Sequence, residues 1–185
     1  MEQSRKSENN DNNITIELKP IGIVRNRSKD ASWGETLGKL SWQERAARMK
    51  GQSDSVSEIT VNPEFADALD GIEGFSHLLI LYWPHLLPEE RRSVTRVHPI
   101  GNKDFPLVGV FATRSPVRPN TILATVVRLL GRHDNVLTVT GLDALDGSPV
   151  LDIKPHYPES IDAGEVRVPE WMERVNRRFD NNPGE

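Results

Sequence analysis

The stretch Gly109–Asn120, GVFATRSPVRPN, holds residue types suited to binding an anion, and we call it the anion loop. Two prolines stiffen it by fixing their own φ angles, and they push the residues before them, Ser115 and Arg118, toward extended backbone. The guanidinium groups of Arg114 and Arg118 are planar forks that match carboxylate or phosphate oxygens. The pattern predicts a preorganised anion site, with two solvated arginines beside an ordinary turn as the alternative.

A second stretch, Asp143–Pro155, reads DALDGSPVLDIKP and gathers carboxylates around a turn. Asp146-Gly147 is a strong turn signal between two strand-like runs, so the pattern predicts a hairpin. Asp152 and Lys154 alternate with apolar residues, which places both polar side chains on one face of a strand. An acidic hairpin with one solvated face is the structural alternative.

Short apolar or alternating runs predict the strands that position these two stretches. They are Ile14–Leu18, Ile21–Arg25, Ser57–Val61, Phe75–Trp83, Val108–Ala112, Thr121–Leu130 and Asn135–Leu142. The apolar run Phe75–Trp83 is the best candidate for a central strand. A turn at residues 131–134 joins the last two strands. Seven or so short strands predict a mainly β protein, a barrel or a sandwich.

Three short segments have helical signals. Trp42–Lys50 follows a possible capping box, Pro63–Leu69 begins with proline after Asn62 as N-cap, and Pro169–Phe179 places apolar residues on one face. We expect residues 1–13 to be a disordered tail, residues 14–168 to form one β domain, and residues 169–185 to form a helix and a frayed end.

Composition excludes several classes of protein. The chain has 185 residues and no cysteine, which rules out disulfides, thiolate metal sites and cysteine nucleophiles. No apolar run approaches the length needed to span a membrane. The histidines lack metal-ligand spacing, so we expect no metal. The glycine-rich fingerprint of doubly wound nucleotide-binding folds is also absent.

Charge is unevenly distributed along the chain. The net charge is −4, yet Arg91–Arg132 contains eight basic residues against one acidic residue. Residues 134–170 are acidic, with only Lys154 and Arg167 in opposition. A local basic surface can bind a polyanion despite a negative net charge, although the two regions could also neutralise each other in the fold.

Four motifs together resemble the TsaA/TrmO-like (YaeB-type) methyltransferase family. They are FSHL at Phe75–Leu78, the anion loop, GLDALDGSPVLDIKP at Gly141–Pro155, and the opening Ile21–Arg25. The resemblance extends roughly from Ile21 to Trp171. It implies a small closed or nearly closed β-barrel with short peripheral helices that binds S-adenosylmethionine. It also implies a cytoplasmic homodimer, with each cofactor site near the subunit interface, that methylates N6 of threonylcarbamoyladenosine in the tRNA anticodon loop.

The resemblance also suggests roles for particular residues. The expected cofactor-binding residues are His77, Arg114, Ser115, Arg118, Asn120, Asp143, Asp146, Gly147 and Ser148. The candidate proton acceptors, which the sequence does not rank, are Asp152, Lys154 and Tyr157. Contacts to tRNA phosphates are expected from Arg91, Arg92 and Arg96.

The chain departs from this family at one place. Members carry a proline-arginine-glutamine signature after the first strand, and residues 26–55 contain no such triplet. Two alternatives therefore stay open beside tRNA methylation. One is S-adenosylmethionine-dependent methylation of a small molecule, and the other is a non-catalytic module that binds the cofactor.

Overall fold

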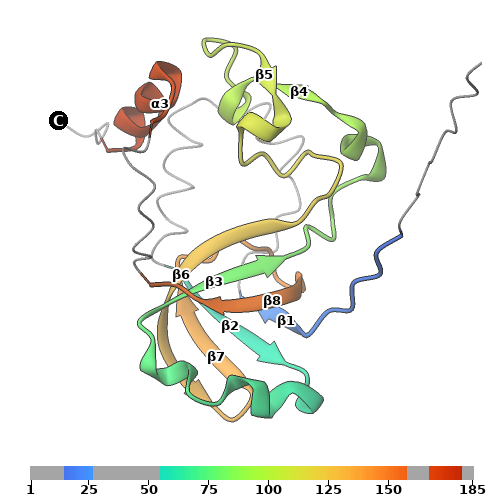
Figure 1. Ribbon diagram of the computed structural model, residues 1–185, viewed down its shortest axis with the longest axis vertical. Coiled ribbons are helices and arrows are strands. Elements are labelled where there is room, and N and C mark those ends of the chain that lie inside the picture. The colour runs from blue at the N-terminus through green and yellow to red at the C-terminus, as the bar shows by residue number, and fades with distance from the viewer. Residues whose placement is uncertain (1–14, 27–54, 158–166, 181–185) are drawn as a thin grey trace, which may run out of the picture.

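Six antiparallel strands close into a barrel in the computed structural model, which describes residues 15–26, 55–157 and 167–180 (Figure 1). The order around the barrel is β1-β2-β7-β6-β3-β8. The strands are β1 (Gly22–Arg25), β2 (Val56–Val61), β3 (His77–Tyr82), β6 (Leu123–His133), β7 (Val136–Thr140) and β8 (Pro149–Pro155). The expected mainly β architecture and the barrel are confirmed.

The barrel interior is filled by the apolar half of each alternating strand. Val24, Ile59, Ile80, Leu137 and Val150 are completely buried there. Each such side chain stabilises the fold by about 1.5–3 kcal/mol relative to an exposed one. The residues between them point outward, and the polar ones among them form the outer surface of the barrel.

Strand β3 forms within the predicted segment Phe75–Trp83, although no strand of a closed barrel is central, because each has two neighbours. It pairs with β6 on one side and with β8 on the other, and Ile80 lies opposite both Thr125 and Ile153. Each side chain on the outer face of β3 therefore has a neighbour on both flanking strands.

The other elements lie outside the barrel. Residues 83–122 form a lobe above it in Figure 1, with β4 (Arg96–Val97) paired to β5 (Val108–Gly109). The 3-10 turns η1 (Pro63–Leu69) and η2 (Ile72–Gly74) lie at the other side of the barrel, below it in this view. The remaining elements are η3 (Glu89–Ser93), η4 (Pro99–Gly101), η5 (Val110–Ala112) and α3 (Glu170–Asp180).

Two predicted strands are wrong. Val108–Ala112 contributes only the two residues of β5, because a 3-10 turn begins at Val110. Within Ile14–Leu18, the described residues have no regular structure, and Ile16 and Leu18 are 77% and 51% exposed. Alternation alone did not make a strand there, because no neighbouring strand pairs with the segment.

Two predicted turns also need correction. Residues 131–133 belong to β6, and the turn to β7 is the pair Asp134-Asn135, with Asp134 at φ 53°. Asp146-Gly147 does form a turn, but β8 pairs with β1 and β3, so the expected hairpin does not exist. The predicted helix Pro63–Leu69 is present as a 3-10 turn and Pro169–Phe179 as α3, whereas Trp42–Lys50 and the tail 1–13 lie outside the described residues.

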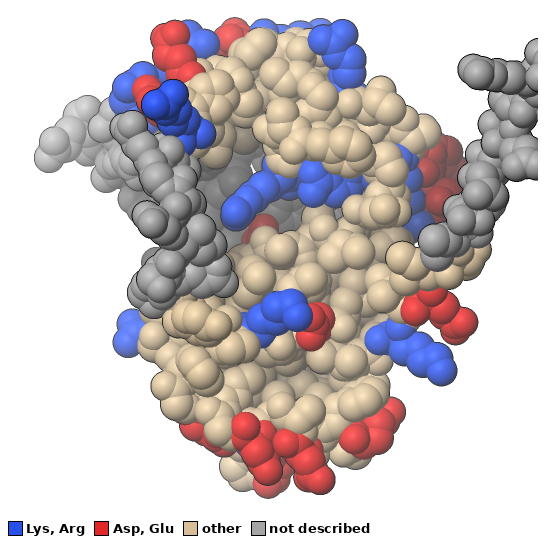
Figure 2. Space-filling model, in the orientation of Figure 1, with Lys and Arg blue, Asp and Glu red and all other residues tan. Residues whose placement is uncertain are grey.

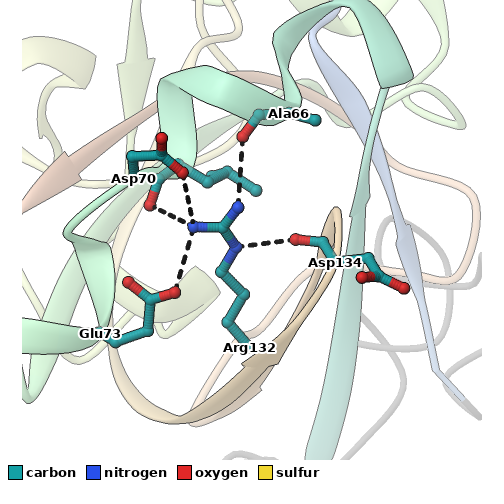
Figure 3. Close-up of polar contacts among 6 residues, drawn as sticks. Ala66, Asp70, Glu73, Arg132 and Asp134 are labelled. Atoms are coloured by element: carbon teal, nitrogen blue, oxygen red, sulfur yellow. Dashed lines mark hydrogen bonds and ion pairs between the residues drawn. The ribbon is translucent and has the colours of Figure 1, made fainter.

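Arg132 on β6 ties η1 and η2 to the end of the β6–β7 hairpin (Figure 3). Its side chain is 15% exposed, and its guanidinium donates from all three nitrogens. The acceptors are the carbonyls of Ala66, Leu69 and Asp134 and the carboxylates of Asp70 and Glu73, at 2.7–3.4 Å. Arg132 therefore belongs to the scaffold rather than to a surface that could bind a polyanion.

We predict that Arg132→Leu lowers the free energy of unfolding by about 1–3 kcal/mol, because it leaves several carbonyl acceptors without their charged donor. Arg128→Leu, at an exposed position on the same strand, is the matched control and should stay within about 0.5 kcal/mol of wild type. Urea unfolding of the three proteins measures both changes. Equal stability of the two variants would show that Arg132 does not brace this end of the barrel.

Candidate functional site

The anion loop is closed on itself by one of its own arginines. Arg118 Nη2 donates to the carbonyl of Thr113 at 2.9 Å and to that of Val110 at 3.2 Å. The Thr113 hydroxyl donates to the same Val110 carbonyl and accepts from the backbone N–H of Ser115. These bonds make Arg118 a brace that fixes the loop, and they keep the Ser115 side chain half-buried inside it.

Arg114 has a different environment. Its side chain is exposed, and no ion pair or side-chain hydrogen bond joins it to the residues that the structure describes. Its guanidinium is thus available to an anion, at the tip of a loop that Arg118 holds in place. Among the residues that the structure describes, two buried polar atoms, Arg118 Nε in the loop and Thr121 Oγ1 just after it, have no hydrogen-bond partner.

The turn Asp143–Ser148 crosses the end of the barrel where β8 begins. Gly147 has φ +80°, which favours glycine, and its N–H donates to the carbonyl of Val24 at 2.9 Å. Asp146 accepts the backbone N–H of Asn26 at 3.1 Å. The Asn26 amide in turn donates to Ser57 and Ala144, so the turn is fastened to β1 and β2.

Asp143 joins this turn to two barrel strands. Its Oδ1 accepts the hydroxyl of Tyr82 on β3 at 2.7 Å and the hydroxyl of Thr125 on β6. Burial raises the pKa of Tyr82 far above its usual value, and the negative charge of Asp143 and its hydrogen bond raise that pKa further. Tyr82 therefore remains a donor at any physiological pH.

His85 lies against the same turn, which the sequence did not indicate. Its Nδ1 is 3.4 Å from Oγ of Ser148, and a Cβ at Gly147 would be 3.6 Å from its Nε2. Ser148 is completely buried, so its hydroxyl faces His85 and not solvent. A Cβ on Gly147, at that 3.6 Å distance from the imidazole, would make an ordinary van der Waals contact, so the positive φ of Gly147, and not crowding by His85, favours glycine there.

The anion loop ends beside this turn. Strand β6 begins at Leu123, three residues after the exposed Asn120, and Thr125 already bonds to Asp143. The fold therefore brings together the two stretches that the sequence marks as chemically active, at one end of the barrel.

His77 and Tyr157 lie at the opposite end. His77 begins β3, is exposed, and has Nδ1 2.9 Å from Oγ of Ser76. Tyr157 follows β8 and its ring lies 6.4 Å from that of Phe75. Strand β8 separates this end from Ser148 by about 20 Å, at about 3.3 Å per residue. A single barrel does not gather all the predicted cofactor residues in one cluster.

Asp152 and Lys154 lie between the two ends, on the outer face of β8. Lys154 Nζ is 2.6 Å from Asp152 Oδ2, which confirms that the two side chains share a face. The other carboxylate oxygen of Asp152 accepts the N–H of Ile153 at 2.9 Å. Both side chains are about half exposed, so the ion pair is open to a ligand.

The three arginines predicted to contact phosphate differ in how free they are. Arg91 is exposed, whereas Arg96 donates to the Leu107 carbonyl at 3.1 Å. Arg92 lies 4.8 Å from the ring centre of Trp83 and pairs with Glu89 at 2.6 Å. Arg92 thus ties η3 to Trp83, the residue that directly follows β3, and a cation–π contact of this kind has no signal in the sequence.

Charge is also separated over the surface in Figure 2. Basic side chains follow a hollow between the lobe and the barrel, and acidic side chains gather at the η1–η2 end. The acidic residues on η1, η2 and the β6–β7 turn are all exposed; they are Glu64, Asp67, Asp70, Glu73 and Asp134.

Comparison with known proteins identifies the family. The tRNA-methyltransferase O N-terminal domain family matches residues 43–163, about two thirds of the chain. The chain belongs to this family. A protein of Archaeoglobus fulgidus named S-adenosyl-L-methionine-binding protein is 44% identical over 142 residues, covering 77% of this chain and 90% of that protein. A second relative, from Methanothermobacter thermautotrophicus and named "Probable S-adenosyl-L-methionine-binding protein", is 44% identical over 150 residues, with 81% and 96% coverage.

Solved structures of the family have the same fold. The crystal structure of TrmO from Pseudomonas aeruginosa matches with a TM-score of 0.56 and 30% identity, covering 83% of this chain and 62% of that one. The chain thus spans about three fifths of the length of the solved TrmO chain. The family predicted from the four motifs is confirmed, and the expected cofactor and the expectation of a methyltransferase agree with these names.

Within the residues that the structure describes, no helix is both long and apolar enough to cross a membrane. The same residues contain no group of three or more histidines and acids placed to hold a metal ion.

The raised pKa of Tyr82 makes a prediction that absorbance can test. In Tyr157→Phe, Tyr82 is the only tyrosine. The folded variant should show no phenolate absorbance at 295 nm at pH ~10, because the pKa of Tyr82 is raised. In guanidinium, where the variant is unfolded, Tyr82 should titrate at pH ~10. Because the folded pKa is the higher one, this group's contribution to stability is complete below pH ~10 and declines above it. Titration of the folded variant near pH 10 would contradict the Tyr82–Asp143 bond.

Proposed function

We propose that the chain binds S-adenosylmethionine and transfers its methyl group to N6 of threonylcarbamoyladenosine in the anticodon loop of tRNA, in the cytoplasm. The observation that carries the proposal is the exposed guanidinium of Arg114 on a loop that Arg118 braces, with the strand that follows this loop bonded through Thr125 to Asp143 of the turn. Membership of the tRNA-methyltransferase O family and the names of the relatives support the cofactor.

The residues at this end of the barrel suit the cofactor's functional groups. Arg114 supplies a cation for its carboxylate, and Asp143 supplies acceptors for its ammonium or ribose hydroxyls. Backbone groups of Asp146–Ser148 are placed to read the adenine edge. The unpartnered Thr121 hydroxyl fits a segment that completes its hydrogen bonds when a polar ligand arrives. When bound, the cofactor supplies a methyl group already activated by a sulfonium.

The chain's part in the reaction is alignment and removal of one proton. Of the three candidate acceptors, we propose Asp152, because a carboxylate needs no prior loss of a proton and Lys154 holds it in place. With the cofactor bound, Asp152 would accept the N6 proton of the substrate. Lys154, at 2.6 Å from Asp152, would act as a positioning residue.

An RNA substrate is supported by the separation of charge. On the face shown in Figure 2, the basic side chains along the hollow lie on the lobe side of the barrel, away from the acidic η1–η2 end. Arg91 and Arg96 are the exposed cations of η3 and β4, and we propose that they contact phosphates.

We also propose a homodimer with each cofactor site near the interface, because His77 lies at the far end of the barrel from the turn. Sedimentation velocity measures that state.

Arg114→Ala should weaken S-adenosylmethionine binding about tenfold or more in calorimetry, because it removes the charge-assisted bond to the carboxylate. Arg128→Ala is the matched control, an exposed arginine on the outer face of β6, and should bind like wild type. Equal affinities of the two variants would place the cofactor elsewhere.

Methyl incorporation into tRNA tests the reaction. With radiolabelled cofactor, wild type should label bulk tRNA from a strain that makes threonylcarbamoyladenosine, and the labelling should fall steeply with salt. Asp152→Asn should lower turnover about 10²-fold while cofactor affinity is kept, and Lys154→Met should lower it less. Cofactor binding without transfer to tRNA would favour a small-molecule substrate or a non-catalytic module.

A further inference from the structure

Two exposed aromatic rings lie together at the His77 end of the barrel, opposite the end that carries the Asp143–Ser148 turn. Phe75 and Tyr157 are 38% and 53% exposed, and their ring centres are 6.4 Å apart at an interplanar angle of 32°. Exposed large apolar side chains that pair across distant segments suggest a binding surface.

The sheet fixes the position of this pair. Phe75 precedes β3 and Tyr157 follows β8, and the two strands pair up to Leu78 opposite Pro155. The N–H of His156 donates to the carbonyl of His77 at 2.9 Å, which extends the ladder beyond the strand end. Both rings are therefore held by backbone pairing before any ligand binds.

Cations flank the rings on the outer face of the same sheet. Arg128 on β6 lies opposite His77, and Lys154 on β8 lies opposite Leu79. Arg128 is exposed and has no ion-pair partner among the described residues. Aromatic faces next to a free guanidinium are the combination that proteins use to stack unpaired bases and to bind the adjoining phosphate.

We propose that the Phe75–Tyr157 pair stacks on an unpaired base of the RNA substrate and that Arg128 binds the phosphate of that base. The inference rests on the proposed function and adds the part of the surface that holds single-stranded RNA. Two rings offer much less area than the roughly 800 Å² per partner of a stable protein interface, which favours a base over a second protein surface.

The test compares variants that keep or remove the aromatic faces. Tyr157→Leu and Phe75→Leu should weaken binding of a fluorescent anticodon stem-loop RNA about tenfold or more, whereas Tyr157→Phe and Phe75→Tyr should bind like wild type. Phe65→Leu is the matched control, because Phe65 is also 38% exposed but lies on η1 at the acidic end. Arg128→Ala should weaken RNA binding and reduce its salt dependence, with cofactor affinity unchanged.

Three results would overturn the stacking site. They are wild-type RNA affinity in the leucine variants, equal loss in Phe65→Leu, and conversion of a dimer to monomer in the leucine variants by sedimentation. Failure of the stacking site can be distinguished from failure of the proposed methylation reaction. If RNA binding depends on the aromatic faces but tRNA is not methylated, the stacking site stands and the proposed reaction fails; if tRNA is methylated equally by all variants, only the stacking site fails.

Discussion

The hydrogen bonds that end on Oδ1 of Asp143 are the constraint on which this barrel end depends. Tyr82 donates from β3 and Thr125 from β6, so one carboxylate oxygen fixes the turn against two strands that the sheet has already paired. The anion loop ends at Asn120, three residues before β6 begins, and Thr125 lies two residues into that strand. The bond from Thr125 therefore ties the end of the loop to the same acceptor as the turn. A cofactor site formed by loops needs such a rigid support.

The arginines of this protein divide into those that hold the fold together and those whose guanidinium groups are exposed. Arg92, Arg118 and Arg132 are half-buried braces, bonded to an aromatic ring, to loop carbonyls, and to the η1–η2 turns respectively. Arg114 and Arg128 have exposed guanidinium groups. Of the eight basic residues counted between Arg91 and Arg132, only part can form a basic surface, so the number of charges overstates the polyanion site.

The sequence predicted the β architecture and the strands β2 and β3 well, because the alternation in Ser57–Val61 and the apolar run Phe75–Trp83 report burial directly. It failed where strand formation depends on a partner that is distant in the sequence. Thr15–Leu18 alternates but has no partner strand, and the Asp146-Gly147 turn leads to β8, which pairs with β1 and β3. The sequence located the motifs of the candidate site, but it did not show which contacts their side chains make. Nothing in the local sequence indicates that Arg118 bonds backward to Val110 or that Tyr82 meets Asp143 across 61 positions.

The central claim is that the anion loop and the Asp143–Ser148 turn together hold S-adenosylmethionine. Amide hydrogen exchange of the full chain with and without the cofactor measures this directly, since backbone groups that contact or are ordered by a ligand exchange more slowly. We predict added protection at residues 109–120 and 143–148, with the η1–η2 turns unchanged. Protection confined to another part of the barrel, with both stretches exchanging as before, would contradict the account.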